Sequence, residues 1–239
     1  IGNRRLLVAL RKQLEQEGVN WLSETLVTGI NHQPECAQVS YSQNSKMRKQ
    51  TFDLVIDCRG TGASTKHAGR DCAPLTNLRS VRGELFQLFA PNVHLSRPIR
   101  LMHPRYQLYI APKGKGFYVV GATEIESDDD SSMTVRSAME LLSAAYSVHP
   151  GFAEANIRQQ VSQCRPAFSD NQPKITVNNS LIQVNGLFRH GFLIAPVVLA
   201  QVENLVTKIK NSTANNNKSQ ALPYDYLLPI HTIEQEVFA

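Results

Sequence analysis

Apolar and polar positions along the 239-residue chain follow two different periods. Apolar side chains recur every three or four positions in three segments, which predicts helices over 4–17, 133–148 and 196–210. Alternating or continuously apolar stretches between them predict strands over 19–28, 37–42, 51–58, 81–88, 99–102, 107–111, 117–121, 157–164 and 180–184. The pattern therefore favours a mixed α/β or α+β fold.

The order of elements in the first quarter of the chain is informative. Residues 43–50 are polar and predict a hairpin turn, and the segment 51–58 is almost continuously apolar, which is typical of a strand covered on both faces. That strand runs into Arg59-Gly60-Thr61-Gly62. Helix, strand, hairpin, buried strand and glycine loop is the order expected for the second half of a Rossmann-like dinucleotide-binding domain.

From residue 78 the pattern changes to short strands separated by turns and followed by the helix at 133–148, which predicts an antiparallel sheet with a helix on it. We therefore expect a partial nucleotide-binding domain over 1–77 and an inserted antiparallel-sheet domain over 78–160. A return to the first domain over 161–210 would follow. The polar stretch 211–219 predicts a flexible linker, and the last twenty residues have little periodicity, so we expect a linker and C-terminal tail over 211–239.

Composition mainly excludes functions. With 42% apolar and 19% charged residues the chain is an ordinary globular protein, and no apolar run is long enough to predict a membrane span. The net charge of +5 is scattered, so no nucleic-acid-binding stripe is predicted. The N-terminus does not resemble a secretory signal. Four cysteines without metal-ligand spacing predict reduced, partly buried thiols, no metal site and a cytoplasmic protein.

Several other polar residues are more simply explained by structure than by chemistry. His103, His149 and His190 have no ligand spacing and are expected to be ordinary polar residues. The acidic run 128–130 is expected to be a solvated loop before the helix at 133–148, with Ser131 or Ser132 as the N-cap.

The most informative stretch is the junction between the strand at 180–184 and the following helix. Gly186 and Gly191 lack a Cβ and would let backbone N–H groups approach a ligand, while the helix N-terminus favours an anion. Arg189 on the same turn is suited to grip a carboxylate. A plain glycine-rich turn with a solvated arginine remains the alternative.

The glycine loop after residue 58 suits a backbone that passes close to a flavin or its ribityl chain. The usual GxGxxG phosphate-binding fingerprint is absent from the chain. We therefore expect that a phosphate-binding βαβ unit of roughly a hundred residues precedes Ile1 in the complete protein.

Seven blocks occur in the order and with approximately the spacing of one known family. They are NRRLL at 3–7, DLVIDCRG at 53–60, VRGE at 81–84, YIAP at 109–112, VVGATE at 119–124, CRP at 164–166 and NGLFRHGFLIAP at 185–196. The chain thus resembles the D-amino-acid oxidase superfamily of FAD-dependent flavoproteins, and within it most closely the glycine oxidases of thiamine biosynthesis.

This resemblance implies an oxidoreductase that removes hydride from the α-carbon of a small amine or amino acid, such as glycine, sarcosine or a D-amino acid, and passes it to FAD. It implies that Arg165 binds the substrate carboxylate, that Tyr109 lies on the substrate side and that Arg189 lies near the flavin or substrate. Flavin-binding residues implied by the resemblance are Gly60, Thr61, Gly62, Arg165, Gly186, Arg189, Gly191, Phe192 and Leu193.

Alternatives remain for these residues and for the whole chain. Arg165 can be a salt-bridge residue, Tyr109 a core or rim aromatic, and Arg189 a surface arginine. Without the phosphate-binding unit, we expect the chain alone to bind FAD weakly or not at all. A truncated, non-catalytic member that acts as a binding or interaction module is the alternative function. The flank left by the missing N-terminal segment would be apolar, which favours a partner or a homo-oligomer.

Overall fold

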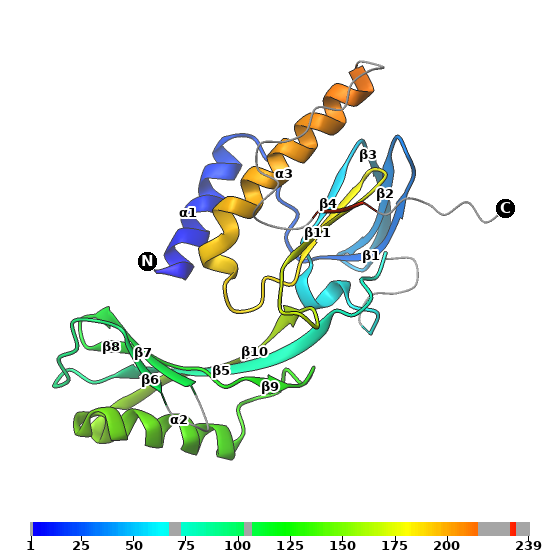
Figure 1. Cartoon of the computed structure of the whole chain (residues 1–239). Helices are drawn as coiled ribbons and strands as arrows, with labels where there is room; N and C mark the ends of the chain where they lie inside the picture. The colour runs from blue at the N-terminus through cyan, green and yellow to red at the C-terminus, as the bar shows by residue number, and fades with distance from the viewer. Residues whose placement is uncertain (1, 67–72, 103–106, 215–229, 233–239) are drawn as a thin grey trace. The chain divides into compact units, whose positions relative to one another are not determined.

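The computed structural model describes residues 2–66, 73–102, 107–214 and 230–232 (Figure 1). The chain divides into two compact units that alternate along the sequence. The first unit comprises Ile1–Thr25 and Arg82–Cys164, and the second comprises Leu26–Val81 and Arg165–Ala239.

The first unit is built on a six-stranded sheet. Its strands are β5 (Arg79–Phe89), β6 (Ile99–Met102), β7 (Gln107–Gly114), β8 (Phe117–Gly121), β9 (Ile125–Glu126) and β10 (Asn156–Ala167). They lie in the order β10-β5-β8-β7-β6, with β9 paired to β5. The pairs β5–β8, β7–β8 and β6–β7 are antiparallel, so the antiparallel sheet expected from the short-strand pattern is present.

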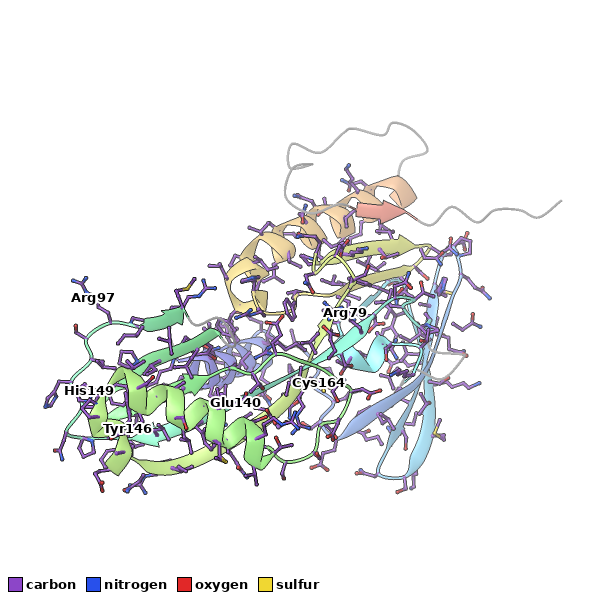
Figure 2. All side chains as sticks on the ribbon, turned by 60° about the horizontal axis from the view of Figure 1, so that its bottom comes forward. Arg79, Arg97, Glu140, Tyr146, His149 and Cys164 are labelled. Carbon is purple, nitrogen blue, oxygen red and sulfur yellow. The ribbon has the colours of Figure 1, made fainter. Side chains whose placement is uncertain are left out.

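Helix α2 (Val135–Val148) covers one face of this sheet (Figure 1). The side chains that form the core between helix and sheet are Phe86, Leu88, Leu108, Ile110, Tyr118, Val120, Leu141, Ala144 and Ala145. The outer face of α2 carries Glu140 and Tyr146, which are both exposed (Figure 2). The short 3₁₀ helix η2 (Pro150–Glu154) follows.

The N-cap of α2 is Thr134, whose side chain accepts a hydrogen bond from the Ser137 N–H, so the predicted cap at Ser131 or Ser132 is wrong. The Ser131 N–H and hydroxyl instead bond to the Asp129 carboxylate, at 2.9 Å each. This local turn occupies the serine before the helix begins.

Helix α1 (Asn3–Gln16) has no buried residue. Its Arg4 donates a hydrogen bond to Gln159 of β10, at 3.1 Å. The exposed apolar side chains of α1 are Leu7, Val8, Leu10 and Leu14. They give the helix an apolar face that is open to solvent among the described residues.

The second unit contains two sheets. The first joins β1 (Thr25–His32), β2 (Ala37–Gln43) and β3 (Lys46–Phe52) in sequence order. The hairpin turn is only Asn44-Ser45, both with positive φ, so the polar turn predicted over 43–50 is mostly strand. Two left-handed residues close a tight hairpin, and β3 is polar because all its side chains are exposed.

The other sheet has the order β13-β11-β12-β4, from β4 (Val55–Asp57), β11 (Lys174–Asn178), β12 (Leu181–Asn185) and β13 (Ile230–Thr232). The pair β11–β12 is antiparallel, whereas β4 and β13 pair in parallel. Helix α3 (Gly191–Ala214) packs on this sheet with Val198 and Val202 against the apolar side chains of the central strands.

Two sequence expectations are wrong in this unit. The segment 51–58 is not one buried strand, because its first two residues belong to β3 and Cys58 is exposed. The last helix starts at Gly191 and not at Pro196, which lies within its first two turns. Strand β13 was not predicted, because it adds to β11 by a pairing between distant segments that local periodicity does not report.

Among the described residues, α3 is one helix that could cross a membrane by length and composition, over Gly191–Asn211. A single such helix is weak evidence, since only its length and composition are considered; its Val198 and Val202 pack on the sheet, and 17% of the segment is buried. The sequence predicted no membrane span, and this one helix is weak evidence against that prediction.

Candidate functional site

Two glycine turns lie at the carboxyl ends of neighbouring parallel strands in the second unit. Strand β4 leads into the 3₁₀ turn η1 (Gly60–Ala63), and β12 leads into Gly186. The strands pair with Gln183 opposite Asp57, so both chains leave the sheet at the same edge. In open α/β sheets this edge is where ligands bind.

A buried side chain joins the two turns. Asn185, 1% exposed, donates from Nδ2 to the Gly60 carbonyl oxygen at 2.9 Å. Its Oδ1 accepts the Gly186 N–H at 2.8 Å. Gly60 and Gly186 both have positive φ, at 60° and 76°, which favours glycine at these positions.

The Arg165-Pro166 block lies beside both turns. A Cβ on Gly60 would be 3.6 Å from Pro166 Cγ, and the Phe188 N–H donates to the Pro166 carbonyl oxygen at 3.1 Å. Arg165 itself is half-buried at the end of β10. The second unit therefore brings the Gly60 turn, the Arg165 block and the Gly186 turn together from three distant parts of the sequence.

The N-terminus of α3 follows the Gly186 turn. Arg189 is exposed on that turn, and the N–H groups of Leu193 and Ile194 bond to the His190 carbonyl oxygen. The N–H groups of Gly191 and Phe192 precede these first intrahelical bonds. Together with the helix dipole they suit an anion or a partly negative oxygen. Phe192 and Leu193 are exposed on the same turn.

Gly186 has a packing role that the sequence did not indicate. A Cβ there would lie 2.7 Å from Phe168 Cε2, which is too close for any real contact. The space in front of this glycine is thus occupied by the buried Phe168 ring within the protein. Gly191 differs, because a Cβ there would meet Leu187 Cβ at an ordinary 3.4 Å.

A polar cluster beneath the Gly60 turn was missed by the sequence prediction. Asp57, 4% exposed, accepts two hydrogen bonds from the Arg59 guanidinium, at 2.8 and 2.7 Å, and a third from Gln183 Nε2 at 3.2 Å. Burial alone would raise the pKa of Asp57, but the hydrogen bonds and charge of Arg59 outweigh it and lower the pKa. A polar residue inside an otherwise apolar strand was the available signal.

The remaining candidates of this turn, Thr61 and Gly62, are half-buried in η1, where the Thr61 carbonyl oxygen accepts the Ser64 N–H at 3.1 Å. Ser64 is 3% exposed, and its hydroxyl oxygen has no hydrogen-bond partner among the described residues. A buried hydroxyl without a partner next to a glycine turn is consistent with a ligand group that would satisfy it.

Tyr109 belongs to the first unit, whereas Arg165 belongs to the second. It lies on β7 between Leu108 and Ile110, which point into the core beneath α2, so its side chain projects from the opposite face. A Cβ on Gly121 of β8 would be 3.1 Å from Tyr109 Oη. The ring thus lies over its cross-strand glycine, and the tyrosine is half-buried and not a core aromatic.

His149, an ordinary polar residue in the sequence interpretation, caps η2 by accepting the Gly151 N–H at 3.0 Å. Cys164 lies on β10 with its Sγ 3.5 Å from the Ser127 carbonyl oxygen (Figure 2). No group of three or more His, Cys, Asp or Glu side chains suited to a metal ion occurs within the described ranges. His103 lies outside those ranges.

These residues fit one part of a flavin cofactor. A left-handed glycine turn, an unsatisfied buried hydroxyl and a helix N-terminus meet the needs of a ring with several carbonyl oxygens and a polar side chain. The phosphate end has no corresponding element, because no GxGxxG occurs in the sequence.

The family profile described as FAD dependent oxidoreductase, DAO, matches residues 1–201. The chain belongs to the DAO family. A putative thiamine biosynthesis oxidoreductase ThiO from Rhizobium etli is 49% identical over 150 residues, which are 63% of this chain and 43% of that protein.

Two solved structures share the fold of this DAO family member. Iminodiacetate oxidase from Chelativorans sp. BNC1 has a TM-score of 0.69 and 22% identity, and the match covers 95% of this chain and 58% of that one. Glycine oxidase from Geobacillus kaustophilus has a TM-score of 0.66 and 21% identity, and the match covers 77% of this chain and 48% of that one. The chain spans about half the length of these relatives. The predicted fold class, Rossmann-like with an antiparallel sheet, is confirmed.

Proposed function

We propose that this chain is the flavin-ring and substrate part of a flavin-dependent oxidase of small amines or amino acids. The observation that carries the proposal is the meeting of the Gly60 turn, the Arg165 block and the Gly186 turn at one sheet edge. Membership of the DAO family and the similarity to a ThiO protein support it. Glycine, sarcosine and D-amino acids are the proposed substrates.

The substrate has one strong handle, its carboxylate, and Arg165 is the residue assigned to it. A guanidinium presents several donors in a planar fork, which fixes both the position and the orientation of a carboxylate. Arg165 is half-buried, so water competes less for this contact than at an exposed arginine. Orientation of this kind is a large share of what a protein contributes to a redox reaction of a bound cofactor.

Tyr109 and Arg189 have supporting roles in the proposal. Tyr109 projects from the face of the first sheet that α2 leaves uncovered, where its hydroxyl can donate to a substrate oxygen. Arg189 is exposed on the turn before α3 and adds positive charge to the helix N-terminus.

Bound FAD would supply the oxidising chemistry, accepting two electrons from the substrate α-carbon. The residues proposed to hold its ring side are Gly60, Thr61, Gly62, Arg165, Gly186, Arg189, Gly191, Phe192 and Leu193. This chain contributes backbone N–H groups, a positive helix end and the polar cluster that fixes the Gly60 turn.

The proposed site is complete only with a phosphate-binding segment. Strand β4 is at the end of its sheet among the described strands, and it has only three residues. Its unpaired edge can accept a further parallel strand. The chain by itself is therefore expected to bind FAD weakly or not at all, and the complete enzyme is proposed to act in the cytoplasm.

The test supplies a phosphate-binding segment from a relative. The part of the Rhizobium etli relative outside the matched 150 residues would be co-expressed with this chain, and the chain would be expressed alone as the control. We expect visible flavin absorbance in the purified complex, and hydrogen peroxide release on addition of glycine, sarcosine or a D-amino acid. A colourless complex that contains both segments would refute the proposal.

A non-catalytic binding module is the second candidate. It is favoured by the match to only about half of each relative's length and by the exposed apolar face of α1. This candidate predicts that the chain binds a partner through α1 and never acquires flavin. Stoichiometric flavin in the chain, alone or with the added segment, would exclude it.

A further inference from the structure

The geometry points to Asn185 as a positioning residue that sets the distance between the two glycine turns of the flavin site. This inference rests on the proposed function for its flavin part, but the hydrogen bonds that carry it belong to the second unit alone. Asn185 is the last residue of β12 and is 1% exposed. Its side-chain amide is occupied at both ends, by one donated and one accepted bond.

The chemistry of the amide explains why this residue type is required. An asparagine side chain places a donor and an acceptor on one small rigid plane. The donor reaches the carbonyl oxygen of Gly60, at the start of η1, and the acceptor holds the N–H of Gly186, where the backbone turns left-handed. One planar group therefore fixes the main chain of both turns at once.

Burial makes these two bonds consequential. Asn185 is 1% exposed and Gly186 is buried, so an unpaired Gly186 N–H would be left without compensation from water. Gly60 is half-buried, and loss of the Asn185 donor would release its carbonyl oxygen. Two backbone bonds of η1 are local, from the Gly62 N–H to Arg59 and from the Ser64 N–H to Thr61. The Leu75 N–H holds the far end of η1 through the Ala63 carbonyl oxygen, at 2.7 Å, and Asn185 holds the Gly60 end.

Gln183, two positions earlier on β12, supports the same interpretation. Side chains two residues apart on a strand share a face of the sheet, and on that face Gln183 bonds to Asp57 of β4 and Asn185 to Gly60 of the turn. Gln183 Nε2 donates to Asp57 at 3.2 Å and to the Ala73 carbonyl oxygen at 2.8 Å. Gln183 thus fixes the strand end before the turn, and Asn185 fixes the turn itself.

Asn185→Asp separates the two bonds. The carboxylate can still accept the Gly186 N–H but has no donor for the Gly60 carbonyl oxygen. Asn185→Ala removes both. Asn178→Asp is the matched control, since Asn178 also ends a strand of this sheet and its Oδ1 has no partner among the described residues.

Backbone hydrogen exchange on the chain alone tests the positioning role. In Asn185→Asp we expect exchange of the Gly62 and Ser64 amides to accelerate about five- to tenfold while the Gly186 amide stays protected. In Asn185→Ala all three should accelerate. Strand amides of β7 and β8 serve as the internal reference. Uniform acceleration across the β11–β12 ladder, or no change at Gly62 and Ser64, would overturn the inference.

Flavin affinity is the second measurement. The chain together with the added segment is titrated with FAD, and binding is followed by flavin fluorescence. We expect Asn185→Asp to weaken FAD binding about tenfold or more and to alter the visible flavin spectrum, with Asn178→Asp unchanged. If Asn185→Asp and the unsubstituted protein bound FAD equally tightly, Asn185 would have no role in flavin binding. If the unsubstituted protein takes up no flavin, the proposed function fails, while the exchange pattern still decides whether Asn185 positions the turns.

Discussion

Arg82 and Glu84 form an ion pair in the interior of the first unit. Arg82 Nη2 lies 2.7 Å from Glu84 Oε1, and the two side chains are 3% and 0% exposed. The same guanidinium donates to the carbonyl oxygens of Asp129 and Ser132, at 2.9 Å each. The guanidinium also pairs with the Asp129 carboxylate, at 2.9 Å. Arg82 thus joins β5 to the loop that precedes α2, and its removal would leave the Glu84 charge buried.

Arg82→Met should therefore destabilise the protein by about 3 to 5 kcal/mol, because it leaves the Glu84 carboxylate buried without its partner. The double variant Arg82→Met with Glu84→Gln should recover part of this loss. Urea unfolding measures both. The exposed pair Arg11–Glu15 is the control, and Arg11→Met should change stability by about 0.5 kcal/mol or less. Equal losses for the two methionine variants would contradict this account.

Acidification should weaken the protein through the same carboxylate. Burial alone would raise the pKa of Glu84, but hydrogen bonds from Ser137, Arg82 and Thr123 and the charge of Arg82 outweigh it and lower the pKa. A carboxyl with a depressed folded pKa contributes stability that is present above its unfolded pKa, about 4.5, and is lost as the pH falls through the folded value. The midpoint of urea unfolding, measured between pH 7 and pH 3, should therefore fall less steeply in Glu84→Gln. If the unfolding midpoint fell equally steeply with pH in both proteins, Glu84 would be excluded as a source of the acid sensitivity.

Gly186→Ala should cost about 2 kcal/mol or more, since the new methyl group meets the Phe168 ring and the backbone has a positive φ. Gly191→Ala is the matched control with an ordinary contact, and we expect little change. Thermal unfolding compares the two variants. The clash is the cause only if Phe168→Leu reduces the cost of Gly186→Ala, which a double-mutant cycle measures.

Arg165→Ala, tested in the complex with the added segment, should raise KM steeply, because loss of the partner of a carboxylate in a desolvated site costs on the order of 2 to 5 kcal/mol. Steady-state oxidation rates of the amino-acid substrate measure the effect. Arg158→Ala is the control on the same strand, where the guanidinium lies over the Phe89 ring at 5.1 Å. An unchanged KM would remove Arg165 from the substrate site.

Lysine at Leu10 of α1 should leave stability within about 0.5 kcal/mol, because the side chain is already exposed. The same change should weaken association of the chain with the added segment or with a second copy, since it places a charge in the apolar face. Analytical ultracentrifugation measures the association, with Met139→Lys on the exposed face of α2 as the control. Equal weakening by both lysines would show that the α1 face has no special role.

Local periodicity identified most elements, and the strands Ile99–Met102 and Phe117–Gly121 have the bounds it predicts. It failed where a strand is made by distant pairing or closed by unusual turns. Most residues of β3 are polar, and this pattern predicts a turn, yet the strand pairs along its whole length with β2. β13 lies in a tail with little periodicity and pairs with a strand more than fifty residues earlier.

The sequence by itself determined the family, the glycine positions and the arginine before proline, because each is a local motif. The tertiary structure decided what those motifs share. It placed Gly60, Pro166 and Phe188 beside one another and assigned Gly186 to contact with Phe168. It also showed Asn185 to be the buried link between the turns. Hydrogen bonds across more than a hundred residues of chain depend on how the sheet is assembled, and no local pattern encodes that distance.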